Sequence, residues 1–187
     1  WENSRVVVRG HSSVEATGNV QIVDCSDNFH SPKIKISGNA RIVYYPKNIN
    51  EFMDFYGLKH TKTKVIFYKA VRKDYEKYYS DYDNDFTYEI GKIKKEQCDS
   101  NTTDNCSFGI HIAHLNWALK FGEDWNNLAI LEVETKIKDI VMPENTDGNV
   151  RTSEIKVLRE VPLSECGLYG QILEKRRSKN KVKKMII

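Results

Sequence analysis

The sequence predicts an α+β fold in which a short β-solenoid (β-helix) segment precedes a mixed α+β domain. Three observations predict it. Pairs of small apolar residues recur six positions apart near the N-terminus, Gly-Asn dipeptides separate them, and the rest of the chain mixes apolar strands with a helical spacing of apolar residues. The 187 residues leave room for a small module and a domain of about 120 residues.

Residues 5–45 carry the repeating pairs, which are Val6/Val8, Val14/Ala16, Val20/Ile22, Ile34/Ile36 and Ala40/Ile42. Gly18-Asn19 and Gly38-Asn39 tolerate the positive φ that corners between short strands require. Strands this short are unstable alone, but stacked rungs would bury a continuous inner face. We therefore expect stacked rungs with four side chains pointing inward, those of Val14, Val20, Ile34 and Ala40. A pair of ordinary β-hairpins is the alternative.

The order of these signals predicts four segments. Residues 1–46 are the last rungs of a solenoid stalk, and residues 24–32 within them form a loop. Because the chain opens at Trp1, in the middle of a repeat, we expect it to be a fragment of a longer stalk protein. Residues 47–63 form a helical cap, 64–172 the α+β domain and 173–187 a frayed basic tail.

The cap is predicted to be a short helix whose apolar side closes the end of the stalk. Asn48 or Asn50 can cap its first turn, and Gly57 can end it. The α+β domain is predicted from apolar runs and turn residues. Its strands are expected at 65–71, 87–90, 109–112, 128–133, 137–141 and 150–161, with a helix at 114–121 and a polar loop at 98–107.

Composition and charge exclude several classes of protein. A net charge of +3 is too small to predict nucleic-acid binding, and no apolar run is long enough to cross a membrane. The four cysteines, Cys25, Cys98, Cys106 and Cys166, are widely spaced and favour a reducing cytosol. Cys98 and Cys106 stand too far apart in sequence for a zinc knuckle, so we predict no metal site even with His111 and His114 nearby.

The candidate chemistry lies in a strand–helix–strand segment. His111 is on the first strand, and Glu132 and Glu134 share one face of the second strand because side chains alternate. A face with a histidine and two carboxylates predicts a cleft. Each residue also has a structural interpretation: a half-buried histidine, or carboxylates on the solvent face of an edge strand.

This segment resembles the ADP-ribosyltransferase superfamily. Gly109-Ile110-His111-Ile112 stands where that fold has its Gly-Ile-Tyr-Phe strand, Ala118 lies in the following helix, and residues 67–71 resemble the first strand. The resemblance implies a nicotinamide-adenine dinucleotide (NAD) as substrate. Lys69 stands where those enzymes have Arg or His, and His111 where many have Tyr or Ser.

The resemblance also implies roles for individual residues. Tyr68, Lys69, Gly109 and His111 would bind the dinucleotide, with the Lys69 ammonium on the pyrophosphate. Glu134 would stabilise the positive charge that develops on the ribose, Glu132 would support the ribose or the acceptor, and His111 would assist. Lys69 has a structural interpretation too, as a lysine reaching to solvent from a strand edge.

Nearly the whole chain is also similar to a set of phage and bacterial proteins that carry a repetitive β-stalk. The shared motifs are Phe55-Tyr56-Gly57-Leu58, Tyr68-Lys69-Ala70-Val71, Gly109-Ile110-His111 and Leu131-Glu132-Val133-Glu134. This resemblance implies a phage-encoded protein of the host cytoplasm but no particular activity.

Two functions remain open. The first is an ADP-ribosyltransferase-like enzyme that modifies a host macromolecule. The second is a non-enzymatic binding module that sequesters a host factor or nucleotide, or a virion-associated stalk protein, with the solenoid as a possible route to homo-oligomers. Convergence of Lys69, His111 and Glu134 on one pocket would favour catalysis, and separate faces would favour binding.

Overall fold

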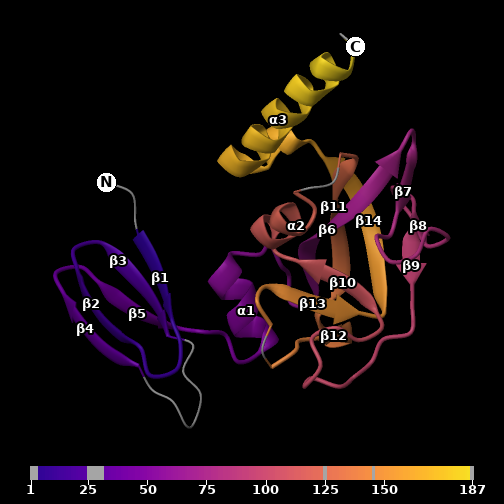
Figure 1. Cartoon of the computed structure of the whole chain (residues 1–187). Helices are drawn as coiled ribbons and strands as arrows, with labels where there is room; N and C mark the ends of the chain where they lie inside the picture. Colours follow the sequence, from indigo (N-terminus) through magenta and orange to yellow (C-terminus); the bar gives the residue numbers. More distant parts are fainter. Residues whose placement is uncertain (1–3, 25–31, 124–125, 145, 186–187) are drawn as a thin grey trace. The chain divides into compact units, whose positions relative to one another are not determined.

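The computed structural model describes residues 4–24, 32–123, 126–144 and 146–185. It divides the chain into two compact units, Trp1–Lys47 and Asn48–Ile187 (Figure 1). The loop predicted at 24–32 lies mostly outside the described residues, as does Cys25.

The first unit contains five short strands in two parallel sheets. The strands are β1 (Ser4–Val8), β2 (Ser13–Thr17), β3 (Val20–Asp24), β4 (Lys33–Ser37) and β5 (Arg41–Tyr44). One sheet has the order β1-β3-β5, and the other pairs β2 with β4. Val8, Ala16 and Ile22 are buried between them, and four half-buried side chains pack against these three: Val14, Val20, Ile34 and Ala40.

The prediction of a β-solenoid is wrong. Val6 pairs with Ile22, and Ile22 with Ile42, so partner strands are much further apart than six positions. Residues six apart, such as Val14 and Val20, lie in different sheets. The six-residue spacing therefore correctly indicates where successive strands lie in the sequence. It does not mean that one strand stacks on the next as rungs of a solenoid would. The result is two small sheets around three buried side chains.

The second unit is built on one antiparallel sheet that curls like half of a barrel (Figure 1). Its order is β12-β13-β10-β6-β11-β14-β9, with β7 on β6 and β8 on β7. The strands are β6 (Lys64–Asp74), β7 (Lys77–Tyr79), β8 (Thr87–Tyr88), β9 (Ile93–Lys95), β10 (Ile110–Ala113), β11 (Leu128–Lys136), β12 (Ile140–Val141), β13 (Asn149–Thr152) and β14 (Glu154–Val161). A mainly β body thus replaces the predicted mixed α+β domain, because polar segments after β6 also form strands. The coarse class, α+β, remains compatible.

Helix α1 (Ile49–Tyr56) has the predicted ends. The Asn48 side chain accepts a hydrogen bond from the Glu51 amide at 3.0 Å, and Gly57 has φ 62°, which favours glycine. Phe52 and Met53 are buried in the core of the second unit, against β6. The apolar side of the helix therefore belongs to that core, not to the end of a stalk as predicted.

The central strands separate two apolar layers. Leu131 and Val133 of β11 belong to the larger layer, with Phe67 of β6. Ile130 faces the opposite side and packs with Leu119 of helix α2 (Leu115–Phe121) and with helix α3 (Gly167–Met185). Because helices cover the second face, the sheet is buried on both sides.

Two further segments differ from the sequence prediction. The extended stretch 150–161 is two strands, β13 and β14, which pair with different neighbours. The basic tail is helical: α3 runs to Met185, and Leu173, at the start of the tail, is buried in the core. Short 3-10 helices occupy Ile137–Asp139 and Leu163–Glu165.

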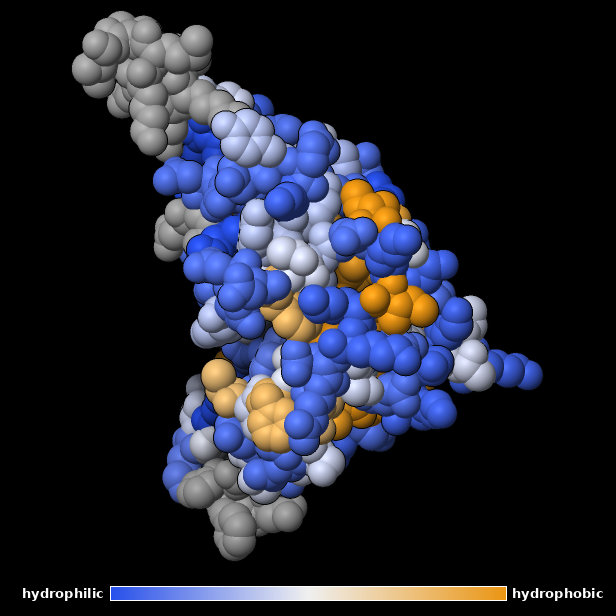
Figure 2. All heavy atoms as spheres, turned by 90° about the vertical axis from the view of Figure 1, so that its right-hand side faces the viewer, coloured by the Kyte–Doolittle hydropathy of each residue, from blue (hydrophilic) through white to orange (hydrophobic). Residues whose placement is uncertain are grey.

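The surface over β7, β8 and β9 is mainly hydrophilic, with separate hydrophobic patches (Figure 2). Ile90 and Ile93 are exposed apolar side chains of this segment. Scattered apolar residues of this kind are ordinary on a protein surface. Among the described residues, no helix is long and apolar enough to cross a membrane.

Candidate ligand-binding cavity

A cavity of about 710 Å³ opens in the second unit beside strands β6 and β10. These neighbours form a single residue pair, Ala113 with Tyr68, and then diverge. Residues of both strands beyond that pair line the cavity, together with helix α2 and the loops 80–86 and 105–109. A volume of this size accommodates a ligand the size of a nucleotide.

Lys69 lies where the two strands separate. Its ammonium group donates a hydrogen bond to the His111 carbonyl oxygen at 2.8 Å and lies 5.5 Å from the centre of the Tyr88 ring. Of the carboxylates in the described ranges, none lies within ion-pairing distance of this nitrogen. Burial lowers the pKa of Lys69 to about 8, although Asp81 partly opposes this shift.

The side chain of Lys69 is enclosed by protein, yet part of its surface remains open to the cavity. A protonated amine in this position has Asp81 in its vicinity but forms no ion pair with a carboxylate of the described residues. Such a group is costly to bury unless a negatively charged ligand accompanies it. The geometry therefore favours an anionic group of a ligand at this point.

His111 lines the same cavity from β10. Its Nε2 atom lies 2.7 Å from the Ser107 carbonyl oxygen, which can only accept, so Nε2 carries a hydrogen. Burial lowers the pKa of His111, and the positive charges of Lys69 and Arg151 lower it further. The neutral imidazole that results has an unprotonated Nδ1 atom.

An arginine holds the loop 80–86 on one side of the cavity. The Nη2 atom of Arg72, on β6, donates to the carbonyl oxygens of Ser80 and Asp81 and to the Asn84 side chain at 2.6 Å. This loop contributes Tyr82 and other lining residues. Arg72 thus holds this wall of the cavity against β6.

A second arginine holds the opposite loop. Arg151, on β13, is fully buried, and its guanidinium donates to three backbone carbonyls of the loop before β10, those of Asp99, Asn101 and Asp104. The same loop is closed by a 2.5 Å hydrogen bond from the Ser107 hydroxyl to Asp99. Arg151 therefore fixes the wall that precedes His111.

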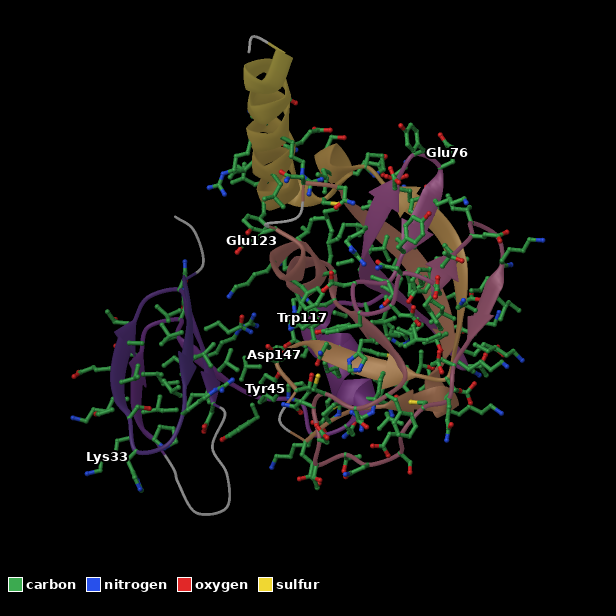
Figure 3. All side chains as sticks on the ribbon, turned by 45° about the vertical axis from the view of Figure 1, so that its right-hand side comes forward. Lys33, Tyr45, Glu76, Trp117, Glu123 and Asp147 are labelled. Carbon is green, nitrogen blue, oxygen red and sulfur yellow. The ribbon has the colours of Figure 1, made fainter. Side chains whose placement is uncertain are left out.

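The open side of the cavity is aromatic and acidic. Trp117 of α2 donates from Nε1 to the Asp147 carboxylate at 2.7 Å, and the two lie side by side in Figure 3. The Trp117 ring stacks on Phe121 with 5.0 Å between ring centres. The lining includes further aromatic rings, Tyr68, Tyr82, Phe86, Tyr88 and Phe108, and further carboxylates, Asp81, Asp83 and Glu96.

Four of the residues predicted from the sequence line this cavity: Tyr68, Lys69, Gly109 and His111. Burial raises the pKa of Tyr68. Gly109 has φ 135°, and a Cβ atom there would lie 2.9 Å from the Cys98 sulfur, so the turn into β10 requires glycine.

Glu132 and Glu134 lie elsewhere. They alternate with the buried Leu131 and Val133, as predicted, but each is held in an ion pair. Glu132 accepts from Arg159 at 2.5 Å, and Glu134 from Lys64 at 2.7 Å. Neither lines the cavity. β10 and β11 are not neighbours, because β6 lies between them.

The sequence analysis missed Arg72, Arg151, Trp117 and the loop carboxylates. Arg151 carried no signal, because its neighbours Asn149, Thr152 and Ser153 are polar and an arginine among such residues is ordinarily exposed. The loop residues carried none, because their convergence depends on how the sheet curls. Within the described ranges, no group of three or more His, Cys, Asp or Glu residues is arranged to hold a metal ion.

No known protein family, curated protein or solved structure matches this chain. The structure itself defines the class of protein: a curled antiparallel β-sheet domain with a ligand-sized cavity where two neighbouring strands separate.

Proposed function

We propose that residues 48–187 form a binding module that takes a nucleotide into the cavity between β6 and β10, with NAD as the first ligand to test. The observation that carries the proposal is Lys69: an enclosed amine that faces a cavity and has no carboxylate of the described segments in ion-pairing distance. A phosphate group of the ligand would supply the missing negative charge.

The walls suit the rest of a nucleotide. Aromatic rings such as Trp117 and Tyr82 offer faces on which a base can stack. Asp81, Asp83 and Glu96 can accept hydrogen bonds from ribose hydroxyls and from the amino group of a base. The ligand that fits has a planar ring, several hydrogen-bond donors and an anionic group.

The balance of charge in the lining selects among nucleotides. Four carboxylates and one lysine line the cavity, and a neutral His111 adds no charge. A polyphosphate would be repelled by the carboxylates. In NAD the pyridinium ring offsets part of the phosphate charge, and AMP carries a single phosphate. Both should bind more tightly than ATP.

Binding is favoured over ADP-ribosyl transfer by the positions of the two glutamates. Transfer requires a carboxylate beside the ribose as positive charge develops there. Glu132 and Glu134 are ion-paired outside the cavity, on a strand that β6 separates from His111. The enzymatic hypothesis therefore lacks the two glutamates to which it assigned roles at the ribose, while Lys69 and His111 do line the cavity.

Isothermal titration calorimetry with NAD, AMP and ATP tests the proposal. We expect saturable binding of NAD and AMP, with ATP weaker. Lys69→Met should weaken binding about 10- to 100-fold, because a charge-assisted hydrogen bond contributes about 1.5–3 kcal/mol. Lys64→Met is the matched control, since Lys64 lies on the same strand but pairs with Glu134.

Equal affinity of wild type and Lys69→Met for NAD would remove the central residue from the proposal. Absence of a heat signal and of any rise in melting temperature with all three nucleotides would overturn it, since a ligand that binds the native state must stabilise it.

A further inference from the structure

We propose that Lys69 is a reactive amine that captures aldehydes in this cavity as a covalent imine. The inference goes beyond nucleotide binding, because it assigns bond-forming chemistry to the same side chain. It rests on where the amine lies and on the groups around it.

The amine has the surroundings that imine-forming lysines require. Its nitrogen makes one hydrogen bond, to the His111 carbonyl oxygen, and faces a cavity of about 710 Å³. No carboxylate of the described segments forms an ion pair that would hold it protonated. Desolvation without a counter-charge favours the neutral amine, which is the nucleophilic form.

Several charged or titratable groups near Lys69 bear on its protonation. Asp81 of the loop 80–86 favours the ammonium form, and His111 on β10 is itself held neutral by burial. Further carboxylates of the cavity lining are Asp83, Glu96 and Asp147. Tyr88 on β8 presents its ring, and burial raises its pKa, so it carries no charge near neutral pH. The sum of these effects leaves the pKa of Lys69 at about 8.

Lys73, on the same strand, provides the contrast. It forms a 2.6 Å ion pair with Glu160, and this partner raises its pKa. Near pH 7, a lysine with a pKa of about 8 has a neutral fraction more than a hundredfold larger than an ordinary lysine. Lower basicity and restricted access reduce this advantage, so we expect at least about tenfold selectivity for Lys69 over Lys73.

The reaction balances without an oxidant or a reductant. The neutral Lys69 nitrogen attacks the aldehyde carbon, and the carbonyl electron pair moves to oxygen, giving a carbinolamine after one proton passes from nitrogen to oxygen. Loss of the hydroxyl group as water, with the second nitrogen proton, then gives the C=N bond. We assign the proton transfers to His111, which lines the same cavity and has an unprotonated Nδ1 atom.

The probe is pyridoxal 5′-phosphate, which combines an aldehyde with a planar ring and a phosphate group. Substoichiometric probe is added to the whole protein, sodium borohydride reduces any imine to a stable amine, and peptide mapping locates it. We expect label on Lys69, at least about tenfold above Lys73, increasing between pH 6 and pH 9 with a midpoint near 8. Pyridoxal, which lacks the phosphate, should label the same residue more slowly.

Three results overturn the inference: label distributed over exposed lysines, an unmodified Lys69 beside modified neighbours, or a midpoint near the ordinary lysine pKa. Two measurements on the wild type separate the inference from the proposed function: calorimetry gives the nucleotide affinity, and peptide mapping gives the label on Lys69. Nucleotide binding without label on Lys69 would contradict the inference alone. Labelling in a protein that binds no nucleotide would contradict the proposed function alone.

Discussion

Replacing Arg151 should destabilise the second unit strongly. Its side chain has no exposed surface, and its guanidinium donates to three loop carbonyls, those of Asp99, Asn101 and Asp104. Hydrogen bonds from a charged donor contribute about 1.5–3 kcal/mol each, so three bonds set an upper limit of about 5–9 kcal/mol.

The net loss should be smaller than this limit. The loop lies at the surface, so its released carbonyls regain hydrogen bonds to water, and a methionine in place of the arginine still fills space. Removing the guanidinium also removes the cost of burying a charge. We therefore expect Arg151→Met to lower the free energy of unfolding by about 2–4 kcal/mol.

Urea unfolding followed by tryptophan fluorescence measures this loss of stability. The rate of Cys106 alkylation reports whether the loop stays ordered. Cys106 is exposed on the segment that Arg151 orders, so its alkylation rate should change in the variant. Arg159→Met is the control, since Arg159 is half exposed and forms ion pairs with Glu132 and Glu165. A loss below about 1 kcal/mol for Arg151→Met, with unchanged Cys106 alkylation, would refute the reasoning.

Three further predictions concern single residues. The folded-state pKa of Lys69 is lowered from 10.5 to about 8, so the unfolded chain binds more protons between these pH values and the free energy of unfolding should rise with pH there. By urea unfolding, this rise between pH 7.5 and 10.5 should be smaller in Lys69→Met than in the wild type by about 3 kcal/mol. Gly148→Ala should lower the free energy of unfolding by about 2–4 kcal/mol, because φ is 130° and the new Cβ would lie 2.5 Å from the His114 ring. Gly91→Ala, where the new Cβ meets open space, is the control and should lower it by about 1 kcal/mol; thermal unfolding measures both. Glu134→Gln should leave the NAD affinity unchanged in calorimetry and change the free energy of unfolding by less than about 1 kcal/mol. A tenfold loss of affinity would instead show that Glu134 contributes to the binding site.

Much of the local structure could be predicted from the sequence. The caps of α1, the strand that became β6 and the helix that became α2 carry strong local signals, because capping and apolar spacing act over a few residues. The tail was predicted to be frayed, yet it is helical as far as Met185, and Leu173 at its start is buried in the core. That burial depends on partners far away in the sequence.

The sequence alone also brought Lys69 and His111 forward as site residues, since a lysine and a histidine stand within short apolar strands. Only the tertiary structure decided that these two share a cavity and that Glu134 does not. Alternation fixes which face of a strand a side chain takes, but strand order is set by pairing between distant segments. Here β6 lies between β10 and β11, so it separates His111 from Glu134 and places Lys69 against the His111 carbonyl oxygen.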